Sequence, residues 1–272
     1  MSVDTAISLE PIRRLERDLR ASSVTLGIGE VRFLVDTYYQ MQEERKRATN
    51  QARALSEIGE PHEVLRWLLA QFETLEKQVK GSLDVYSASD PTGSWARSVM
   101  GIGPVIAAGL LAHIDIEKAR TAGAIWRYAG LDPTVEWKKG ERRPWNAQLK
   151  TLCWKIGESF VKTSTRDGAF YGQIYSERKE LETRRNEAGE FGDQAAAKLE
   201  KFKIGKSTDA FKAYSTGMLP PAHIHSRAKR YAVKLFLAHY HEVAWRERFG
   251  TAPPLPYSIA QQEHTHKIEA PS

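Results

Sequence analysis

An apolar seam in the first third of the sequence is the feature that most restricts the fold of this chain. Its members recur at steps of three and four residues: Leu65, Leu68, Phe72, Leu75, Val79, Leu83 and Tyr86. That spacing puts them on one face of a helix and predicts packing against a second helix. Apolar residues with helical spacing also run through 30–55, and Gly59-Glu60-Pro61 separates the two segments. We therefore predict an antiparallel, coiled-coil-like helical hairpin over residues 29–88.

The rest of the sequence also reads as helical, and the predicted fold class is mainly α. The expected order is a flexible segment at 1–28, the hairpin, a loop at 87–93 and a compact helix-hairpin-helix domain at 94–175. A charged, solvated arm and a long C-terminal helix follow at 176–249, with a disordered tail at 250–272. The last helix is expected from Pro221 to Arg248 and is apolar nearly all round from Tyr231 to Trp245, which is typical of a buried helix.

Composition narrows the class of protein. The chain has 272 residues, 41% of them hydrophobic, one cysteine and a formal net charge of +6. No run of about 18 apolar residues predicts a membrane span, and the first residues lack the apolar core of a signal peptide. A single cysteine provides no disulfide framework. These features predict a cytoplasmic, nucleoid-associated protein that binds no membrane, and the moderate positive charge permits a polyanionic partner.

The stretch "SVMGIGPVIAAGLLAHI" (98–114) contains two glycines around one isoleucine. Gly101 and Gly103 permit a positive φ or a close backbone approach, Ile102 is expected to point inward, and Pro104 suits a first helical turn. Backbone amides at such a turn and at Val105 can hold a phosphate at the positive end of the helix dipole. A tight turn between two core helices with nothing bound is the other interpretation.

A basic and aromatic segment follows the glycine turn. Between Trp126 and Arg166 there are nine basic and four acidic residues, together with four of the seven tryptophans. Clustered lysines and arginines attract DNA mainly through counterion release. The predicted DNA contacts in this segment are Lys138, Lys139, Arg142, Arg143 and Lys150. A solvated surface loop is the alternative for the cations, and we expect Trp126 and Trp154 to lie in the core.

Two blocks in this region, "GIGP" at 101–104 and "YAGLDP" at 128–133, resemble the C-terminal half of DEDD transposases. These are insertion-sequence recombinases guided by a bridge RNA, and the resemblance spans about a third of the chain, from Leu65 to Lys162. It implies a helix-hairpin-helix region that grips DNA. It also implies an origin in a mobile element or phage.

The sequence departs from that family at both catalytic positions. Residues 1–64 are too few for the family's RuvC-like nuclease domain with four acidic residues. The serine thought to act as nucleophile is replaced, since the corresponding residues read Trp137-Lys138-Lys139-Gly140. We therefore predict a DNA-binding protein of the transposase type with no catalytic residues of its own. The alternative is an active transposase or recombinase whose catalysis a partner supplies.

The remaining expectations concern ligands and partners. The expected partner is duplex or branched DNA, structured RNA is an alternative, and the hairpin predicts a homo-oligomer. We expect no cofactor and no metal site: the side chains of His239 and His241, two apart on a helix, point in nearly opposite directions. His223 and His225 can contact phosphate when protonated. The "HSRAKR" cluster at 225–230 is interpreted equally as a solvated helix start or a DNA contact. Ser159, Thr163 and Ser164 have no identifiable base.

Overall fold

The computed structural model describes residues 15–59, 63–254 and 268–271, and every regular element in these ranges is a helix. This confirms the mainly α fold class. The chain divides into two compact units. One comprises Met1–Arg97 and Gly103–His113, and the other comprises Ser98–Ile102 and Ile114–Ser272. Within the described ranges, no helix is both long enough and apolar enough to cross a bilayer.

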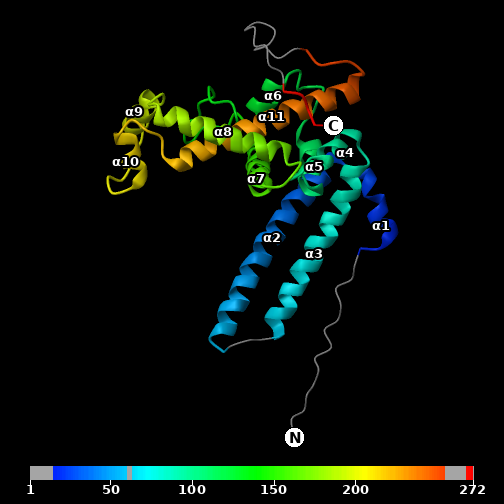
Figure 1. Ribbon diagram of the computed structural model, residues 1–272. Helices are drawn as coiled ribbons and strands as arrows, with labels where there is room; N and C mark the ends of the chain where they lie inside the picture. Colours follow the sequence, from blue (N-terminus) through cyan, green and yellow to red (C-terminus); the bar gives the residue numbers. More distant parts are fainter. Residues whose placement is uncertain (1–14, 60–62, 255–267, 272) are drawn as a thin grey trace. The chain divides into compact units, whose positions relative to one another are not determined.

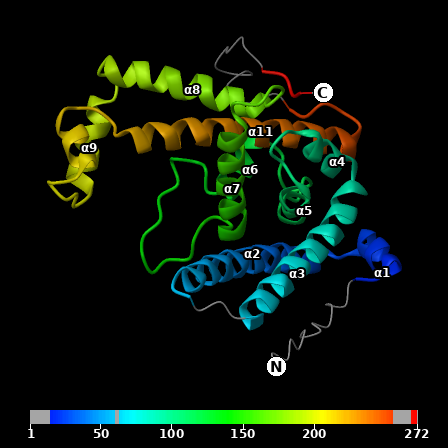
Figure 2. The same cartoon turned by 60° about the horizontal axis from the view of Figure 1, so that its bottom comes forward.

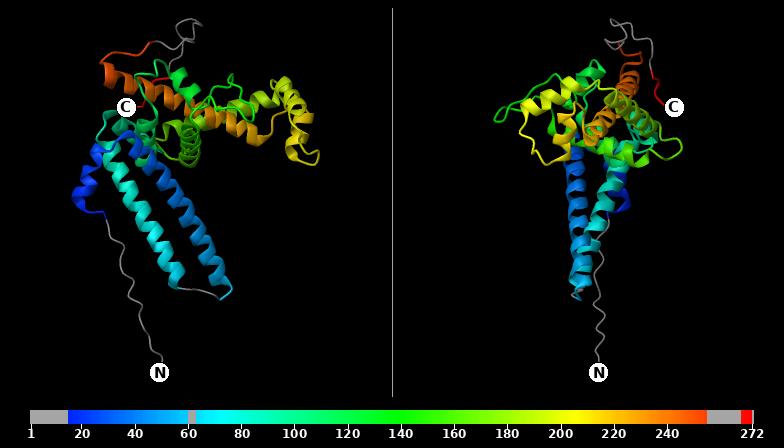
Figure 3. Two further views of the ribbon diagram at one scale, coloured as in Figure 1. Left: turned by 180° about the vertical axis from the view of Figure 1, so that it is seen from behind. Right: turned by 60° about the vertical axis from the view of Figure 1, so that its left-hand side comes forward.

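The first unit is built around a helical hairpin, which Figures 1 and 3 show as two long antiparallel helices. Its helices are α2 (Ile28–Glu57) and α3 (Glu63–Ala88), close to the predicted segments. The expected loop at 87–93 is shorter than predicted, because α3 continues to Ala88 and α4 begins at Pro91 (Pro91–Ser98).

The base of the hairpin holds the core of the first unit. The helix α5 (Pro104–His113) packs there against α2 and α3. The fully buried members of this core are Val31, Val35, Leu83, Val105, Ala108 and Ala112. The apolar seam is covered only at this end, because Leu68 and Leu75 remain 36% and 39% exposed.

The segment before the hairpin contains two short helical elements. The helix α1 (Arg17–Ala21) and the 3₁₀ turn η1 (Ser22–Thr25) pack on α3. The Nε of Arg20 donates a hydrogen bond to the carbonyl of Gly81 at 3.3 Å. The flexibility of this segment stays a prediction, and its first part, 1–14, lies outside the described residues.

The second unit is organised by a long buried helix, α11 (Pro221–Phe249), which matches the predicted C-terminal helix. The helix α8 (Phe170–Glu187) runs along it, and α7 (Ala147–Thr163) and the short α6 (Ala122–Tyr128) also pack on it (Figure 2). The largest side chains of this core are aromatic: Phe160, Tyr171, Phe236 and Tyr240.

The predicted solvated arm is wrong for α8, since a buried ion-pair network ties this helix to α11. The Glu182 side chain is 1% exposed and contacts Arg178 at 2.5 Å and Arg227 at 2.8 Å. The arm turns at Gly189, where φ is +80°, into α9 (Gly192–Lys201), and α10 (Asp209–Ser215) packs on α9.

Part of the predicted C-terminal tail contacts the second unit. The Nε2 of His239 is 2.7 Å from the carbonyl oxygen of Ile268. The tail is therefore not disordered at its last described residues, whereas 255–267, including His264 and His266, lie outside the described ranges.

Candidate nucleic-acid interface

The basic loop connects α6 to α7, and Figure 2 shows it as a long green excursion from the helices. A tight turn orders its tip. The Trp137 Nε1–H donates to the carbonyl of Glu141 at 2.8 Å, and the Glu141 N–H donates to the carbonyl of Lys138 at 3.2 Å. Gly140 supplies the positive φ of +96° that this turn requires. The loop residues predicted to contact DNA are all exposed: Lys138, Lys139, Arg142 and Arg143.

Two tryptophans support the cations at the end of this loop. The Arg143 guanidinium lies 5.6 Å from the centroid of Trp137, and the Lys150 ammonium lies 4.0 Å from that of Trp145. The two rings meet edge to face at 6.2 Å. Cations over indole faces are held in place without a carboxylate, so their positive charge is not neutralised.

The close packing of Trp145 explains a glycine in the second motif block. A Cβ on Gly130 would lie 2.8 Å from the Trp145 ring, and φ there is +66°. The helix α6 therefore ends in a turn that only glycine fits. Asn146 precedes α7 as its N-cap, and its side chain accepts a hydrogen bond from the Leu149 N–H at 2.8 Å. This brings Lys150, in the first turn of α7, next to the loop.

Lys150 lies among like charges that come from three segments. Burial, and then the positive charges of Arg230 and Arg143, lower the pKa of Lys150. Burial likewise lowers the pKa of Lys234 on α11, where Arg230 lowers it further and Asp132 opposes the shift. In the described part of the chain, neither Lys150 nor Arg230 forms an ion pair. We call Arg143, Lys150, Arg230 and Lys234 the cationic cluster.

The cations of the "HSRAKR" segment, which the sequence suggested as a solvated helix start or a DNA contact, have different surroundings. Arg227 binds Glu182 and Gln194, and Lys229 forms an ion pair with Glu158. These two cations therefore have structural partners, whereas Arg230 is exposed and belongs to the cationic cluster.

The glycine turn has one structural and one open glycine. Gly101 has a φ of +99°, and its carbonyl accepts a hydrogen bond from the Ser159 hydroxyl at 2.5 Å. A Cβ on Gly103, in contrast, would meet nothing within 4 Å. Ile102 is 4% exposed, as predicted for an inward plug, and the Val105 side chain is buried in the hairpin core.

The helix α5 begins at Pro104. The backbone amides of its first turn have no acceptor within the helix, but the Ala107 N–H donates to the Gly103 carbonyl at 3.0 Å. The space beside Gly103 leaves room for a ligand near the start of α5. Whether a phosphate binds there stays a prediction.

Each histidine that suggested a metal site has its own partner in the fold. The Nδ1 atoms of His223, His225 and His239 lie 3.3, 2.7 and 2.7 Å from the hydroxyls of Tyr214, Tyr175 and Tyr171. The Nε2–H of His241 donates to the Ala119 carbonyl at 2.8 Å. Over the described ranges, no three His, Cys, Asp or Glu residues converge in a group able to hold a metal ion.

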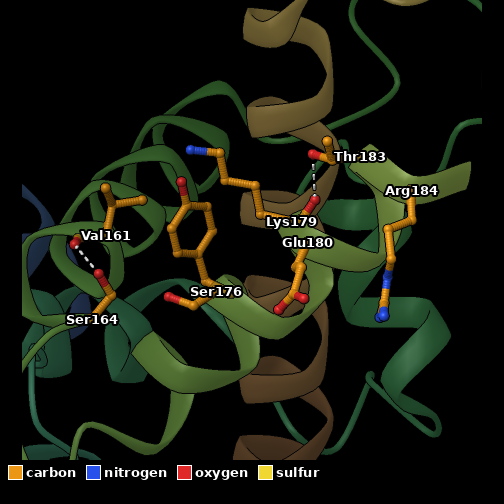
Figure 4. A pocket seen from close by; sticks show the side chains of 8 residues that line it. Val161, Ser164, Ser176, Lys179, Glu180, Thr183 and Arg184 are labelled. Carbon is orange, nitrogen blue, oxygen red and sulfur yellow. Dashed lines mark hydrogen bonds between the residues drawn. The ribbon is translucent and has the colours of Figure 1, made fainter. Parts of the chain in front are cut away.

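The hydroxyl groups near the interface serve the backbone. Ser159 binds the Gly101 carbonyl, and Thr163 and Ser164 donate to carbonyls one turn earlier in α7. A shallow pocket of about 460 Å³ lies between α7 and α8, with Lys179, Glu180 and Arg184 at its wall (Figure 4). The Ser164 and Thr183 hydroxyls at this pocket also donate to backbone carbonyls.

A comparison of the sequence with known protein families finds a match that includes residues of this interface. Residues 94–165 match the Transposase IS116/IS110/IS902 family. No curated protein and no solved structure matches the chain. The transposase-like region covers about a quarter of the chain and contains the glycine turn, α5, α6, the basic loop and all of α7. The predicted resemblance to a transposase C-terminal region is confirmed for these residues. The bridge RNA and the helix-hairpin-helix function stay predictions.

Sequence reasoning missed Lys234 and misplaced Trp154, and it named Arg230 only as part of the "HSRAKR" cluster. Arg230 and Lys234 lie outside the transposase-like region and join it only because α11 packs on α6 and α7. Trp154 is 57% exposed, so its predicted place in the core is wrong. The helical spacing of α7 could have shown that Trp154 is exposed. The buried face of the helix is formed by Leu149, Leu152, Cys153, Ile156 and Phe160. Trp154 falls outside that face.

Proposed function

We propose that this chain is a transposase-related DNA-binding protein that contacts phosphates through the basic loop and the cationic cluster. The observation that carries the proposal is the assembly of Arg143, Lys150 and Arg230, three like charges from three segments, without a neutralising carboxylate. Such an arrangement raises the free energy of the unbound protein, and a bound polyanion relieves this cost. The match of 94–165 to a transposase family supports DNA as the polyanion.

The three acidic residues of the loop support this assignment, because within the described residues none forms an ion pair with the four exposed cations, and Asp132 accepts hydrogen bonds from Thr134. Glu136 contacts Lys201 at 3.3 Å, and the Glu141 carboxylate accepts a hydrogen bond from the Lys138 backbone amide at 3.4 Å. The open amides at Gly103 and Val105 are proposed as a second phosphate contact, of a kind that reads the backbone and not the bases.

The proposed activity is binding without strand cleavage by this chain. The family's serine position reads Trp137-Lys138-Lys139-Gly140, and the nearby Ser159, Thr163 and Ser164 hydroxyls are engaged with backbone carbonyls. A lysine at the serine position cannot form a phosphoester bond with DNA.

A salt titration of the full chain tests the proposal. Fluorescence anisotropy with a labelled duplex, a four-way junction and a structured RNA gives the affinity as a function of salt. The log–log slope is expected to be about −0.9 for each phosphate neutralised. Reversal of Lys138, Lys139, Arg142 and Arg143 to glutamate is expected to flatten the slope by several phosphates and to lower the affinity at 100 mM salt at least tenfold.

A matched control carries the same change of charge on the hairpin. Its four reversed cations have exposed side chains: Lys46, Arg47, Arg53 and Arg66. Equal losses in the two variants would show a nonspecific effect of net charge and contradict the proposed surface. Stronger binding to the RNA would replace DNA by RNA as the partner, and a covalent protein–DNA adduct would favour an active recombinase.

A further inference from the structure

Trp154 is the residue of the interface that a duplex-binding function leaves unexplained. It lies on the solvent face of α7 with 57% of its surface exposed, compared with 40% for Trp67 and 37% for Trp137. Its indole makes no ring–ring contact within the described ranges. The nearest cation is the Lys229 ammonium, 5.7 Å from the ring centroid.

The position of Trp154 on α7 connects it to the cationic cluster. Lys150 precedes it by one helical turn, so the two side chains share a face of the helix. Lys229 approaches the ring from α11, where its stem packs on Gly157: a Cβ there would lie 2.5 Å from the Lys229 Cγ. The Glu158 carboxylate next to the ring is neutralised by the same Lys229.

An exposed indole beside phosphate-binding cations suits one ligand in particular. The faces of bases in a duplex are covered by their neighbours in the stack, whereas an unpaired base offers its face to an aromatic side chain. Lys150, one turn earlier on the same face of α7, then holds a phosphate that flanks that base. The indole of Trp145 is less available, because the Lys150 ammonium lies over its ring at 4.0 Å, whereas the Lys229 ammonium stays 5.7 Å from the Trp154 ring centroid.

We propose that Trp154 stacks on an unpaired base, so that the protein prefers nucleic acid with a single-stranded segment over a fully paired duplex. This inference rests on the proposed function, since it needs the cationic cluster to hold phosphates. It names the substrate class of that same surface: a strand opened, branched or unpaired next to the phosphates that Lys150 and its neighbours contact.

The test compares a 20-nucleotide single strand with the matching duplex, using the full chain at constant salt. The Trp154→Ala variant is expected to lose about tenfold in affinity for the single strand, the effect typical of one stacked base. Its affinity for the duplex is expected to stay within about twofold of the native value. Trp154→Phe, which keeps an aromatic face, is expected to restore most of the single-strand affinity.

A 2-aminopurine base in the single strand supplies a direct readout of stacking. Its fluorescence is expected to be quenched by the native chain and by Trp154→Phe, and not by Trp154→Ala. Phe33→Ala is the matched control: Phe33 is an aromatic residue on α2, it is 69% exposed, and its substitution is expected to leave binding and quenching unchanged.

Each outcome separates the two proposals. Equal losses on single strand and duplex, or no loss on the single strand, overturn the stacking proposal and leave the phosphate surface intact. Absence of binding to every nucleic acid by the folded native chain overturns the proposed function itself. If circular dichroism shows that Trp154→Ala is unfolded, the Trp154→Phe variant decides, since loss of quenching in that folded variant contradicts stacking.

Discussion

At the scale of single residues, the two glycines of the turn have different structural roles. Gly101 needs its positive φ and lies against α7, where a Cβ would come within 3.2 Å of the Ser159 hydroxyl and 3.4 Å of the Phe160 ring. Gly103 has open space around its Cα. A pattern of Gly-x-Gly in a sequence does not distinguish a glycine required by the fold from one that leaves room for a ligand.

We predict that Gly101→Ala and Gly103→Ala separate stability from binding. Gly101→Ala should lower the free energy of unfolding by about 2 kcal/mol, because an alanine at this φ is strained. Gly103→Ala should change it by less than about 0.5 kcal/mol and should weaken DNA binding, since a methyl group would crowd the open amides. Urea unfolding and anisotropy measure the two effects. Normal stability of Gly101→Ala would remove the structural role assigned to its φ.

At the scale of helices, an ion-pair network decides where α8 lies. Burial raises the pKa of Glu182, but the hydrogen bond and charge of Arg227 and the charge of Arg178 outweigh it, so the net pKa is lowered. Both guanidiniums also lie over aromatic rings, Arg178 over Tyr231 at 4.6 Å and Arg227 over Phe191 at 4.5 Å. The buried carboxylate therefore stays charged and joins α8, α9 and α11.

We predict that Glu182→Gln destabilises the second unit by about 2 kcal/mol, because it leaves two half-buried guanidiniums without their buried counter-charge. Glu190→Gln is the control: its ion pair with Arg185 is exposed, and pairs of this kind contribute less than about 1 kcal/mol. Thermal unfolding of both variants checks the difference. Equal midpoints would show that aromatic packing alone positions α8.

The helices themselves could be predicted from the sequence, because apolar residues at helical spacing mark α2, α3 and α11 within a few residues of their bounds. Contacts between segments distant in the sequence could not. The buried role of Glu182 depends on Arg227, and the charge cluster at Lys150 depends on Arg230. A run such as "SERKELETRR" therefore reads as solvated until the partner helix is known.

At the scale of the whole molecule, the hairpin is the part whose apolar surface remains largely uncovered. In the described parts of α2 and α3, fully buried residues occur only near the base of the hairpin, at Val31, Val35 and 81–87. Towards the tip, Ile58 and Val64 are 69% and 59% exposed, and Trp67 is 40% exposed. Two antiparallel helices alone cannot enclose such a seam, whereas a second hairpin can cover it.

We therefore expect two chains to associate through their hairpins, with Trp67, Leu68 and Leu75 at the contact. Light scattering at micromolar concentration should give the mass of two 30.7 kDa chains for the native protein. The double variant Trp67→Glu, Leu68→Glu should give the mass of one, because four charges at a shared apolar seam repel and require desolvation. Circular dichroism of that variant should still show its helices, since the hairpin base is untouched.

A native protein with the mass of one chain would exclude the hairpin as an oligomer contact. A dimer in which the double variant persists would place the contact elsewhere on the molecule.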